Sequence, residues 1–429
     1  MKGNGAGHTP IEGESPAAPW QAPVDQQVAA IEERLVGVRR HLHMHPEPSC
    51  EEYETSRYLA EQLEQAGIRT RLLRDGLGVI GDFDLGHVTE TTPRIALRAD
   101  IDALQIQDAK RTPYASRKSG LCHACGHDAH ATMILGAALA ASEMHKSGRL
   151  PGGDFGVRLR FLFQPAEEES LGARWLVEQG AVDDVDAILA QHVDPERTLG
   201  TVGIRYGVLT ANCDEVELIV EGSGGHAARP HHTRDPIAAA AHLISALYQF
   251  LPRSVDARDP VVFTVGKVAG GTLSNVIPDR VEIQGSLRTL QAETRTRVHD
   301  RIEEIVHGVK EASGTTIHLR FPTSIDGVNN DRRCTAALEA ASREVLGDEA
   351  IQPVELPSMG AEDFAAYLDR VPGAMLRLGC APPGFTAPFL HAPDFDVDER
   401  VLAIGTRIML RAALRLADGS GDFSGGAGI

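Results

Sequence analysis

The sequence predicts an α/β protein of two domains, in which a layered α/β domain carries an inserted, smaller, ferredoxin-like α+β domain. Three observations support this prediction. Helical and strand patterns alternate up to about residue 205, as a layered α/β domain requires. From about residue 213 to 321 the order becomes strand, helix, strand, strand, helix, strand, which is the split ferredoxin-like motif. After about residue 332 the alternation returns.

The first domain begins with a helix over residues 26–43, where apolar residues recur at helical spacing from Val28 to Leu42. A second helix over 53–66 ends at Gly67, a residue type that commonly follows helix C-termini. Short apolar stretches then predict strands at 94–99, 157–163 and 187–190, and a further helix begins near Asp128.

Residues 207–322 are expected to form the inserted domain, because the six elements predicted there make a complete structural unit. The expected strands are 213–221, 260–268, 279–288 and 315–321, and the expected helices are 235–251 and 291–312. This order predicts a four-stranded antiparallel sheet with two helices on one face.

The larger domain is therefore expected to be discontinuous, formed by residues 25–206 and 323–417. Its last part contains a predicted helix near 361–369, a strand near 374–379 and a final helix near 398–416. The ends of the chain, 1–24 and 418–429, are rich in glycine and small or polar residues, and we expect them to be flexible tails.

The composition is that of a globular protein with an acidic surface. The chain has 42 Lys and Arg against 60 Asp and Glu, a net charge of −18, which disfavours nucleic acid or an anionic membrane as a partner. No apolar run is long enough for a transmembrane helix, and residues 1–24 lack the apolar core of a signal peptide. The 6 cysteines are sparse and indicate reduced thiols. We therefore expect a cytoplasmic protein that acts on a small molecule.

One stretch, Cys122-His-Ala-Cys-Gly-His-Asp-Ala-His130, concentrates cysteine, histidine and aspartate. A second cluster, Gln164-Pro-Ala-Glu-Glu-Glu169, follows it. Thiolate, imidazole and carboxylate groups are ligands of transition metals such as zinc, nickel or manganese. A glutamate beside such a metal can act as a general base. The combination predicts a metal-dependent hydrolase.

The predicted strands explain how these groups meet. Polar side chains follow three of them: Asp100 and Asp102 after the first, Glu167 to Glu169 after the second, and His192 after the third. In open α/β sheets, functional sites assemble at the carboxyl ends of the strands. Asp100 and Asp102 are two residues apart, so in an extended chain they point the same way.

Each feature also has a plainer explanation when it is taken alone. Cys122 and Cys125 could form a redox pair, although the residues that follow are not typical of a thioredoxin-like site. A run of glutamates is more often a solvated surface, and a single histidine such as His192 or His391 is more often an ordinary core or surface residue. Their joint placement after strands favours the metal site.

Eight stretches spread over about residues 35–400 carry a resemblance: 39–47, 96–104, 123–130, 163–168, 224–228, 275–278, 358–364 and 390–393. Together they resemble the dinuclear metallo-amidohydrolases of the aminoacylase and carboxypeptidase family. The branch they resemble most contains hippurate hydrolase, N-acetyldiaminopimelate deacetylase and the auxin-conjugate (IAA-amino acid) hydrolases.

The resemblance implies two divalent metal ions per subunit, with zinc, manganese, nickel and cobalt as candidates. It implies that five residues are their ligands: Cys125, His127, Glu168, His192 and His391. It also implies that Glu167 is the general base and acid, and that Asp102 is the carboxylate that orients the site.

The inserted domain is implied to be a lid and a dimerisation domain, which would make the protein a homodimer or a dimer of dimers. His226 is implied to reach the substrate oxyanion, usually in the site of the partner subunit. Asn275 and Arg288 are implied to contact the free carboxylate of the substrate.

The implied reaction is hydrolysis of the amide bond of an N-acyl amino acid, which releases a carboxylic acid and a free amino acid. Three alternatives remain open at this point. The first is a dipeptidase or carboxypeptidase of the same family, and the second is a non-catalytic, metal-binding dimeric protein. The third is a redox-sensing protein that uses Cys122 and Cys125.

Overall fold

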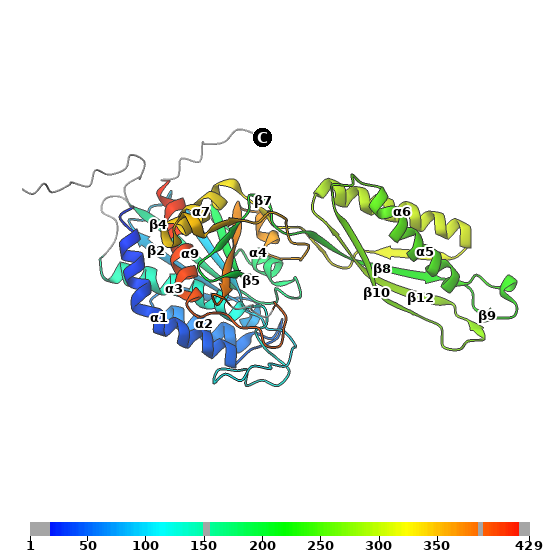
Figure 1. The fold of residues 1–429 in the computed structure, drawn as a ribbon, viewed down its shortest axis with the longest axis horizontal. Coiled ribbons are helices and arrows are strands. Elements are labelled where there is room, and N and C mark those ends of the chain that lie inside the picture. Colours follow the sequence, from blue (N-terminus) through cyan, green and yellow to red (C-terminus); the bar gives the residue numbers. More distant parts are fainter. Residues whose placement is uncertain (1–17, 149–154, 385–388, 420–429) are drawn as a thin grey trace, which may run out of the picture.

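The computed structural model describes residues 18–148, 155–384 and 389–419. Figure 1 shows two domains, a large one built around an eight-stranded sheet and a small one built around a five-stranded sheet. The predicted α/β class with two domains is confirmed. Most of the expected N-terminal tail, residues 1–17, and most of the C-terminal one, 420–429, lie outside the described residues.

The large sheet has the strand order β1-β2-β4-β3-β5-β17-β6-β16. Its strands are β1 Arg69–Leu72, β2 Val79–Gly86, β3 Arg94–Asp100, β4 Gly156–Gln164, β5 Ala187–Thr198, β6 Val202–Ile204, β16 Ile351–Pro353 and β17 Gly373–Ala381. The central strands β4, β3, β5 and β17 are neighbours and run parallel to one another. Their carboxyl ends therefore share one edge of the sheet, as predicted for the site.

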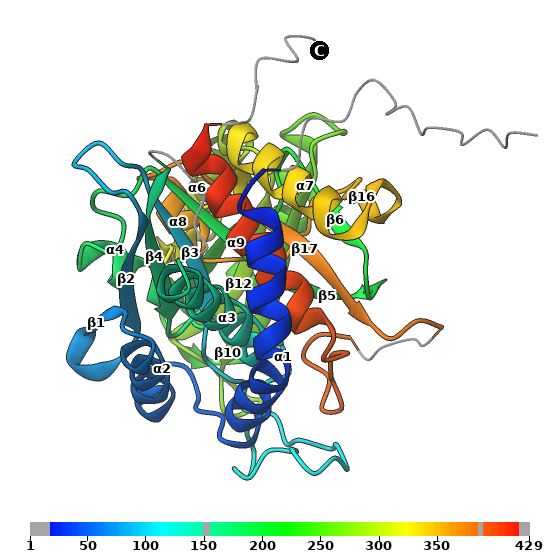
Figure 2. The ribbon, with the colours of Figure 1, turned by 90° about the vertical axis from the view of Figure 1, so that its left-hand side faces the viewer.

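Helices cover both faces of this sheet. They are α1 Gln21–Met44, α2 Tyr53–Gln65, α3 His127–Lys146, α4 Gly172–Glu178, α7 Arg332–Leu346, α8 Ala365–Leu368 and α9 Val401–Asp418. Figure 2 shows α1, α3 and α9 in front of the sheet, where the largest hydrophobic core lies. A smaller core on the opposite face includes residues of α4 and α8. Among the described residues, no helix is long and apolar enough to cross a membrane.

The first helix begins earlier than expected. It starts at Gln21, and both Trp20 and Val24 are completely buried in the large core. The expectation of a flexible tail up to residue 24 is therefore wrong for residues 18–24. The physical reason is that burial of an indole and a valine side chain ties this segment to the core, which a local composition rich in proline and alanine does not reveal.

The helix predicted near 361–369 is also shorter than expected, because only Ala365–Leu368 is helical. The side chain of Asp363 instead accepts hydrogen bonds from Arg98 and from the backbone N–H of Ala173. These long-range contacts hold the preceding residues in an irregular turn.

The small domain has the predicted fold. Its strands are β8 Asn212–Glu221, β10 Val261–Gly270, β12 Arg280–Thr289 and β13 Thr316–Arg320, and its helices are α5 Pro236–Phe250 and α6 Ala292–Ser313. The strands are antiparallel in the order β10-β12-β8-β13. A short strand of two residues, β14 Ser324–Ile325, also pairs with β8. Buried residues of both helices and of alternate strand positions form one core, so the helices lie on a single face of the sheet.

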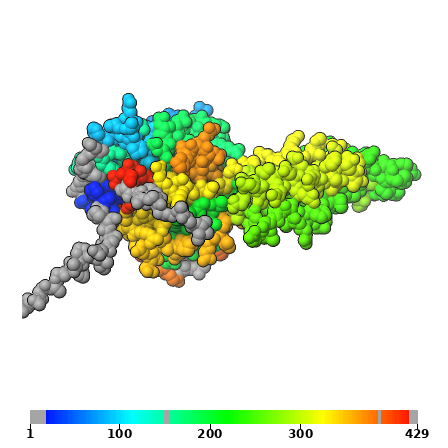
Figure 3. All heavy atoms as spheres, turned by 90° about the horizontal axis from the view of Figure 1, so that it is seen from above, coloured from blue at the N-terminus to red at the C-terminus, as the bar shows by residue number. Residues whose placement is uncertain are grey.

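Two connecting segments, which lie side by side, join the two domains. In them β7 Gly207–Val208 pairs antiparallel with β15 Asn329–Asn330. The Asn330 side chain donates hydrogen bonds to the carbonyl oxygens of Arg205 and Met375, which anchors this ladder to the large domain. Figure 3 shows the small domain extending away from the large one beyond this connection. The sheet of the small domain begins at Asn212, against an expected domain start at residue 207.

Candidate metal centre

The loop before α3 brings a thiol and an imidazole to the carboxyl edge of the large sheet. Cys125 lies in this loop, and His127 is the first residue of the helix. Between them Gly126 has a φ of 86°, and a Cβ atom there would lie 2.5 Å from Cγ2 of Val193. Glycine is therefore required for the loop to approach β5 this closely. As a result, Sγ of Cys125 lies 3.5 Å from Nε2 of His192.

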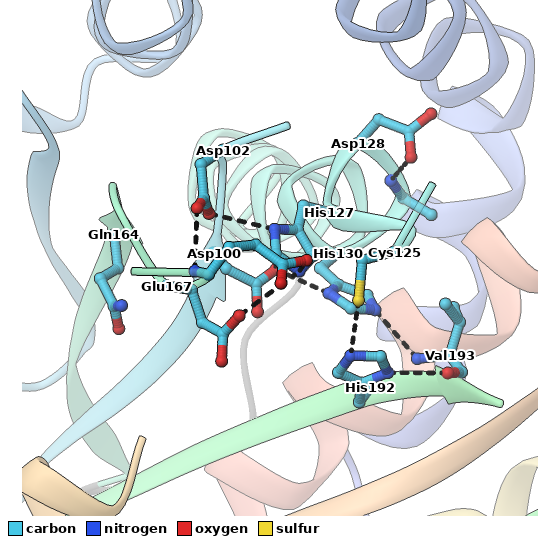
Figure 4. A network of polar contacts seen from close by, with 12 residues as sticks. Asp100, Asp102, Cys125, His127, Asp128, His130, Gln164, Glu167, His192 and Val193 are labelled. Carbon is cyan, nitrogen blue, oxygen red and sulfur yellow. Dashed lines mark hydrogen bonds and ion pairs between the residues drawn. The ribbon is translucent and has the colours of Figure 1, made fainter. Parts of the chain in front are cut away.

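The His127 ring is held by Asp100, the last residue of β3, and by Asp102, two residues beyond it (Figure 4). Its Nδ1 lies 3.1 Å from Oδ1 of Asp102 and 3.8 Å from Oδ1 of Asp100. Asp100 also bonds Nδ1 of His130 at 2.7 Å. Because Nδ1 of His127 is engaged by carboxylate, its Nε2 is free to face the centre of the site.

Glu167 and Glu168 follow β4. The backbone N–H of Glu168 donates to Oδ2 of Asp102 at 3.0 Å, so Asp102 orients both His127 and Glu168. Oε1 of Glu168 lies 3.9 Å from Nε2 of His127 and 3.4 Å from Nε2 of His391. Oε2 of Glu167 also lies 3.9 Å from Nε2 of His127.

His192 lies inside a strand and not after one. The prediction that a strand ends at this residue is wrong, because β5 continues to Thr198. The Nδ1 atom of His192 lies 2.7 Å from the carbonyl oxygen of Val193, which leaves its Nε2 directed toward Cys125. A run of apolar residues followed by polar ones marks burial, not the end of a strand.

His391 reaches the same point from near the end of the chain. It adopts a left-handed backbone conformation with a φ of 66°, and its N–H donates to the carbonyl oxygen of Ala124 at 2.8 Å. This bond places His391 beside the loop that carries Cys125. The structure thus brings together all five residues that the resemblance implied as ligands, despite a sequence separation of more than two hundred residues.

The donor set fits transition-metal ions. Nε2 of His127 and Oε1 of Glu168 are buried and have no hydrogen-bond partner among the described residues. Buried polar atoms without partners are costly, and a metal ion would satisfy both. Two of the clusters of potential ligand atoms contain Cys125, one with His127 and His192 and one with Glu168 and His391. Cys125 would therefore lie between two metal ions if both clusters were occupied.

Burial sets the protonation of these groups. It raises the pKa of Cys125 and lowers the pKa of His192 well below its usual value, so His192 is a neutral imidazole able to bind a metal. Burial, together with the nearby carboxylate of Glu362, raises the pKa of Glu167 well above its usual value. Burial also raises the pKa of Cys122 to about 11. A redox pair needs an accessible, acidic thiol, so the state of Cys122 disfavours that alternative.

Arg98, a buried cation beside the site, was not predicted from the sequence. Arg98 of β3 is almost completely buried and donates to Asp100, to Asp363 and to Oε1 of Gln164, while Glu362 forms an ion pair with it at 3.2 Å. The arginine thus stabilises carboxylates next to Glu167. A charged residue in the middle of an apolar strand was the signal that could have identified it.

A cleft of about 1060 Å³ opens over the candidate metal centre. Its lining includes Cys125, Glu167, Glu168, His192 and His391. Arg288 of β12 in the small domain also lines this cleft, and its guanidinium donates to the carbonyl oxygen of Met359 at 2.8 Å. Of the three residues implied in the inserted domain, Arg288 is therefore the one that the structure places at the site.

His226 and Asn275 lie elsewhere in the same subunit. His226 belongs to β9 Gly225–His226, which Figure 1 shows at the end of the small domain farthest from the large one. The N–H of Ala227 donates to the carbonyl oxygen of Asn275 at 3.1 Å, so the two residues are neighbours. Neither lines the cleft over the candidate metal centre.

Comparisons with known proteins identify relatives across nearly the whole chain. The model of peptidase family M20/M25/M40 matches residues 96–415. A probable hydrolase of Synechocystis is 42% identical over 89% of this chain and 95% of its own length. N-acetyl-L-cysteine deacetylase of Bacillus subtilis is 38% identical over 91% of this chain and 90% of its own. IAA-amino acid hydrolase ILR1-like 4 of Arabidopsis thaliana is 36% identical over 89% and 85%, respectively.

Solved structures give the same result. A putative aminohydrolase from methicillin-resistant Staphylococcus aureus has a TM-score of 0.85 at 30% identity and covers 93% of this chain and 99% of its own. A dinuclear metal-binding peptidase from Bacillus subtilis has a TM-score of 0.77 at 32% identity and covers 91% and 99%. This likeness and the two donor groups that share Cys125 support a centre for two divalent metal ions.

Proposed function

Because the chain belongs to peptidase family M20/M25/M40 and is a metal-dependent amidohydrolase, we propose that its substrates are N-acyl amino acids. The observation that carries this proposal is the convergence of five metal-binding side chains beside Glu167 in an open cleft. The names of two relatives support the substrate class, since one is a deacetylase of N-acetyl-L-cysteine and the other a hydrolase of IAA-amino acids. The products are a carboxylic acid and a free amino acid.

Glu167 is the proton carrier in this proposal. Its side chain is close to the candidate ligands, with Oε2 at 3.9 Å from Nε2 of His127. Burial raises its pKa above the usual value of a carboxyl group, which makes it a better proton acceptor than an exposed glutamate. It removes a proton from the attacking water as the water oxygen bonds to the amide carbon. It then delivers that proton to the nitrogen as the C–N bond breaks.

The five converging side chains would hold two divalent ions, and their nitrogen, sulfur and oxygen donors suit zinc, manganese, nickel or cobalt. When bound, such ions polarise a carbonyl oxygen and lower the pKa of water. Asp102 positions His127 and Glu168 through hydrogen bonds at 3.1 and 3.0 Å.

Arg288 is proposed to bind the free carboxylate of the substrate. It lines the cleft from the small domain, and a guanidinium can pair with a carboxylate through two parallel hydrogen bonds. Its contact with the carbonyl oxygen of Met359 uses one N–H group, and the guanidinium forms no other hydrogen bond to the described residues.

A second subunit is proposed to supply His226 and Asn275. Both lie at the far end of the small domain, where Leu273 is 65% exposed and Val276, paired in register with His226, is 44% exposed. Strand β10 is an edge of the small sheet and exposes Val268. Exposed apolar side chains and an unpaired edge favour contact with another chain, and a two-fold dimer is the commonest solution.

The first experiment measures hydrolysis of N-acetyl, N-benzoyl and indole-acyl amino acids after each candidate metal has been restored. Glu167→Gln should keep its metal content and substrate binding but lose activity by about 10²- to 10⁴-fold, as expected for a general acid–base. Glu169→Gln, the next carboxylate of the same run, is the matched control and should stay close to wild type. Near-normal turnover by Glu167→Gln would remove this residue from the mechanism.

The second experiment tests the contribution across the dimer. Inactive Glu167→Gln protomers and inactive His226→Ala protomers are mixed, and heterodimers are isolated by two affinity tags. One of the two sites then has both groups intact, so partial activity should return. Heterodimers that form but stay inactive would show that His226 does not act in the partner's site.

A further inference from the structure

Arg377 of β17 occupies a position that the reaction described above does not use. It is paired in parallel register with His192 of β5. Its neighbours Leu376 and Leu378 belong to the large core on the helix-covered face, whereas Met375 belongs to the core on the opposite face. Because side chains alternate along a strand, Arg377 points to the same side as Met375 and lines the cleft over the candidate metal centre.

The guanidinium of Arg377 is half-buried and has no hydrogen bond or ion pair within residues 18–148, 155–384 and 389–419. The other arginines of the cleft are engaged. Arg197 pairs with Asp194 at 3.0 Å and donates to Gln352 at 2.7 Å, and Arg288 donates to Met359. A charged group that is partly removed from water without a partner is unfavourable, and an anionic ligand would supply the missing partner.

Within the part of the chain that the structure describes, no carboxylate forms an ion pair with Arg377. Asp194, the acidic residue nearest in sequence to His192 in the cleft lining, is already occupied by Arg197. Glu196 and Glu355 of the cleft lining are exposed to solvent, and the remaining acidic residues of the lining are Glu167, Glu168 and Glu362 of the candidate site. Arg377 therefore offers planar N–H donors to a ligand anion from the sheet side of the cleft.

We propose that Arg377 binds a second anionic group of the substrate, in addition to the α-carboxylate. This inference rests on the proposed function and specifies its substrate class as N-acyl amino acids that carry two carboxylates. The second carboxylate belongs either to the acyl group, as in an N-succinyl amino acid, or to the amino acid side chain, as in an N-acyl glutamate.

The architecture suits a dianion. Arg288 approaches from β12 of the small domain and Arg377 from β17 of the large domain, so the two cations line one cleft from different domains. The cleft of about 1060 Å³ has room for a ligand with both groups, since pockets for small molecules span ~300–1,000 Å³. A substrate with two carboxylates would be held at both ends, with its amide between them beside Glu167.

The test compares three substrates that share one amide chemistry: N-acetyl-alanine, N-succinyl-alanine and N-acetyl-glutamate. Wild type should have a higher kcat/KM for one of the two dianions than for N-acetyl-alanine. Arg377→Met should reduce kcat/KM for that dianion by roughly tenfold to 100-fold, as expected when a charged hydrogen bond is lost, and should leave N-acetyl-alanine nearly unchanged. Arg377→Lys should fall between the two, because it keeps the charge and loses the planar fork.

Arg197→Met is the matched control, since it removes the same charge from the same cleft where the arginine is already paired. An equal fall in the dianion preference in both variants would show a general electrostatic effect and overturn the assignment of Arg377. Preference for the succinyl substrate places the anion on the acyl side, and preference for the glutamate substrate places it on the amino acid side. A preference that survives in Arg377→Met contradicts the inference.

Binding separates this inference from the proposed function. N-succinyl-alanine and N-acetyl-glutamate are titrated into Glu167→Gln and into Glu167→Gln/Arg377→Met by calorimetry, with the metals restored. A loss of affinity for the dianion in the double variant supports the role of Arg377 even if wild type hydrolyses none of the three compounds, an outcome that would refute only the proposed reaction. Equal affinities in the two variants refute the inference even if hydrolysis is observed.

Discussion

Replacing Asp102 by asparagine tests how the protein orients its metal ligands. The carboxylate of Asp102 accepts three hydrogen bonds. Oδ2 accepts from Oγ of Ser49 at 2.7 Å and from the N–H of Glu168 at 3.0 Å, and Oδ1 lies 3.1 Å from Nδ1 of His127. Asparagine has a single acceptor oxygen, so it cannot reproduce both sets of contacts.

The two possible orientations of the asparagine amide both damage the site. If its oxygen replaces Oδ2, its NH₂ group faces Nδ1 of His127, and that nitrogen must become an acceptor. The proton of the neutral imidazole then moves to Nε2, the atom that faces the candidate metal centre. If the amide is turned over, its NH₂ group opposes the N–H of Glu168 and the hydroxyl of Ser49. The first orientation disturbs His127, and the second disturbs Glu168.

Loss of a partner that orients a metal ligand typically weakens metal binding by about 10- to 100-fold, which corresponds to about 1.4–2.7 kcal/mol. The assay is titration of metal-free protein with Zn²⁺ in competition with a chelator near neutral pH. Ser49→Ala is the matched control, because it removes one donor to Asp102 and leaves both ligand contacts in place. The reasoning is refuted if Asp102→Asn binds Zn²⁺ as tightly as wild type, or if Ser49→Ala loses as much affinity as Asp102→Asn.

Two further predictions concern metal binding by Cys125 and the stability of the small domain. Cys125→Ser should lower Zn²⁺ affinity by more than the roughly 10- to 100-fold expected for an orienting partner, whereas Cys122→Ser should mainly lower the melting temperature, because its side chain is buried in the large core. Equal metal affinity in the two variants would contradict the proposed role of Cys125 as a metal ligand. Despite the burial of Asp214, hydrogen bonds from His299 and Arg295 lower its pKa to about 2. The ionised carboxylate should therefore contribute about 2 kcal/mol to the free energy of unfolding at pH values above its ordinary pKa of ~3.9. This contribution should be lost as the pH falls toward 2. In urea unfolding, Asp214→Asn should therefore be less stable than wild type at neutral pH and approach it in acid; a difference that does not change with pH would exclude this linkage.

The catalytic chemistry was predictable because its donors are concentrated in short stretches next to strong strand patterns. Asp102 lies two residues after the end of β3, and Glu167 and Glu168 follow β4 within a few residues. The small domain was predictable for a related reason, because apolar periodicity along β8 and α6 reflects burial on one face. In both cases local sequence carries the information, since neighbours in the chain share the same strand or helix.

Other features depend on contacts between distant segments. Trp20 is buried only because α1 packs on the large core, and the turn before α8 is irregular only because Asp363 is bonded to Arg98. Whether Arg377 has an ion-pair partner among the described residues likewise depends on which carboxylates the fold places beside it. Local sequence patterns do not predict these partners, because the partners lie on strands and loops that are distant in the sequence.

By itself, the sequence determined the α/β class, the order of elements in the inserted domain and the stretches that carry the candidate metal ligands. The tertiary structure alone decided that His391 lies beside the loop of Cys125, that Arg288 lines their cleft and that His226 does not. The physical reason is the range of the interactions involved. Periodicity and motif chemistry act over a few residues, whereas convergence and domain placement arise from the pairing of β17 with β5 and from the paired connections β7 and β15.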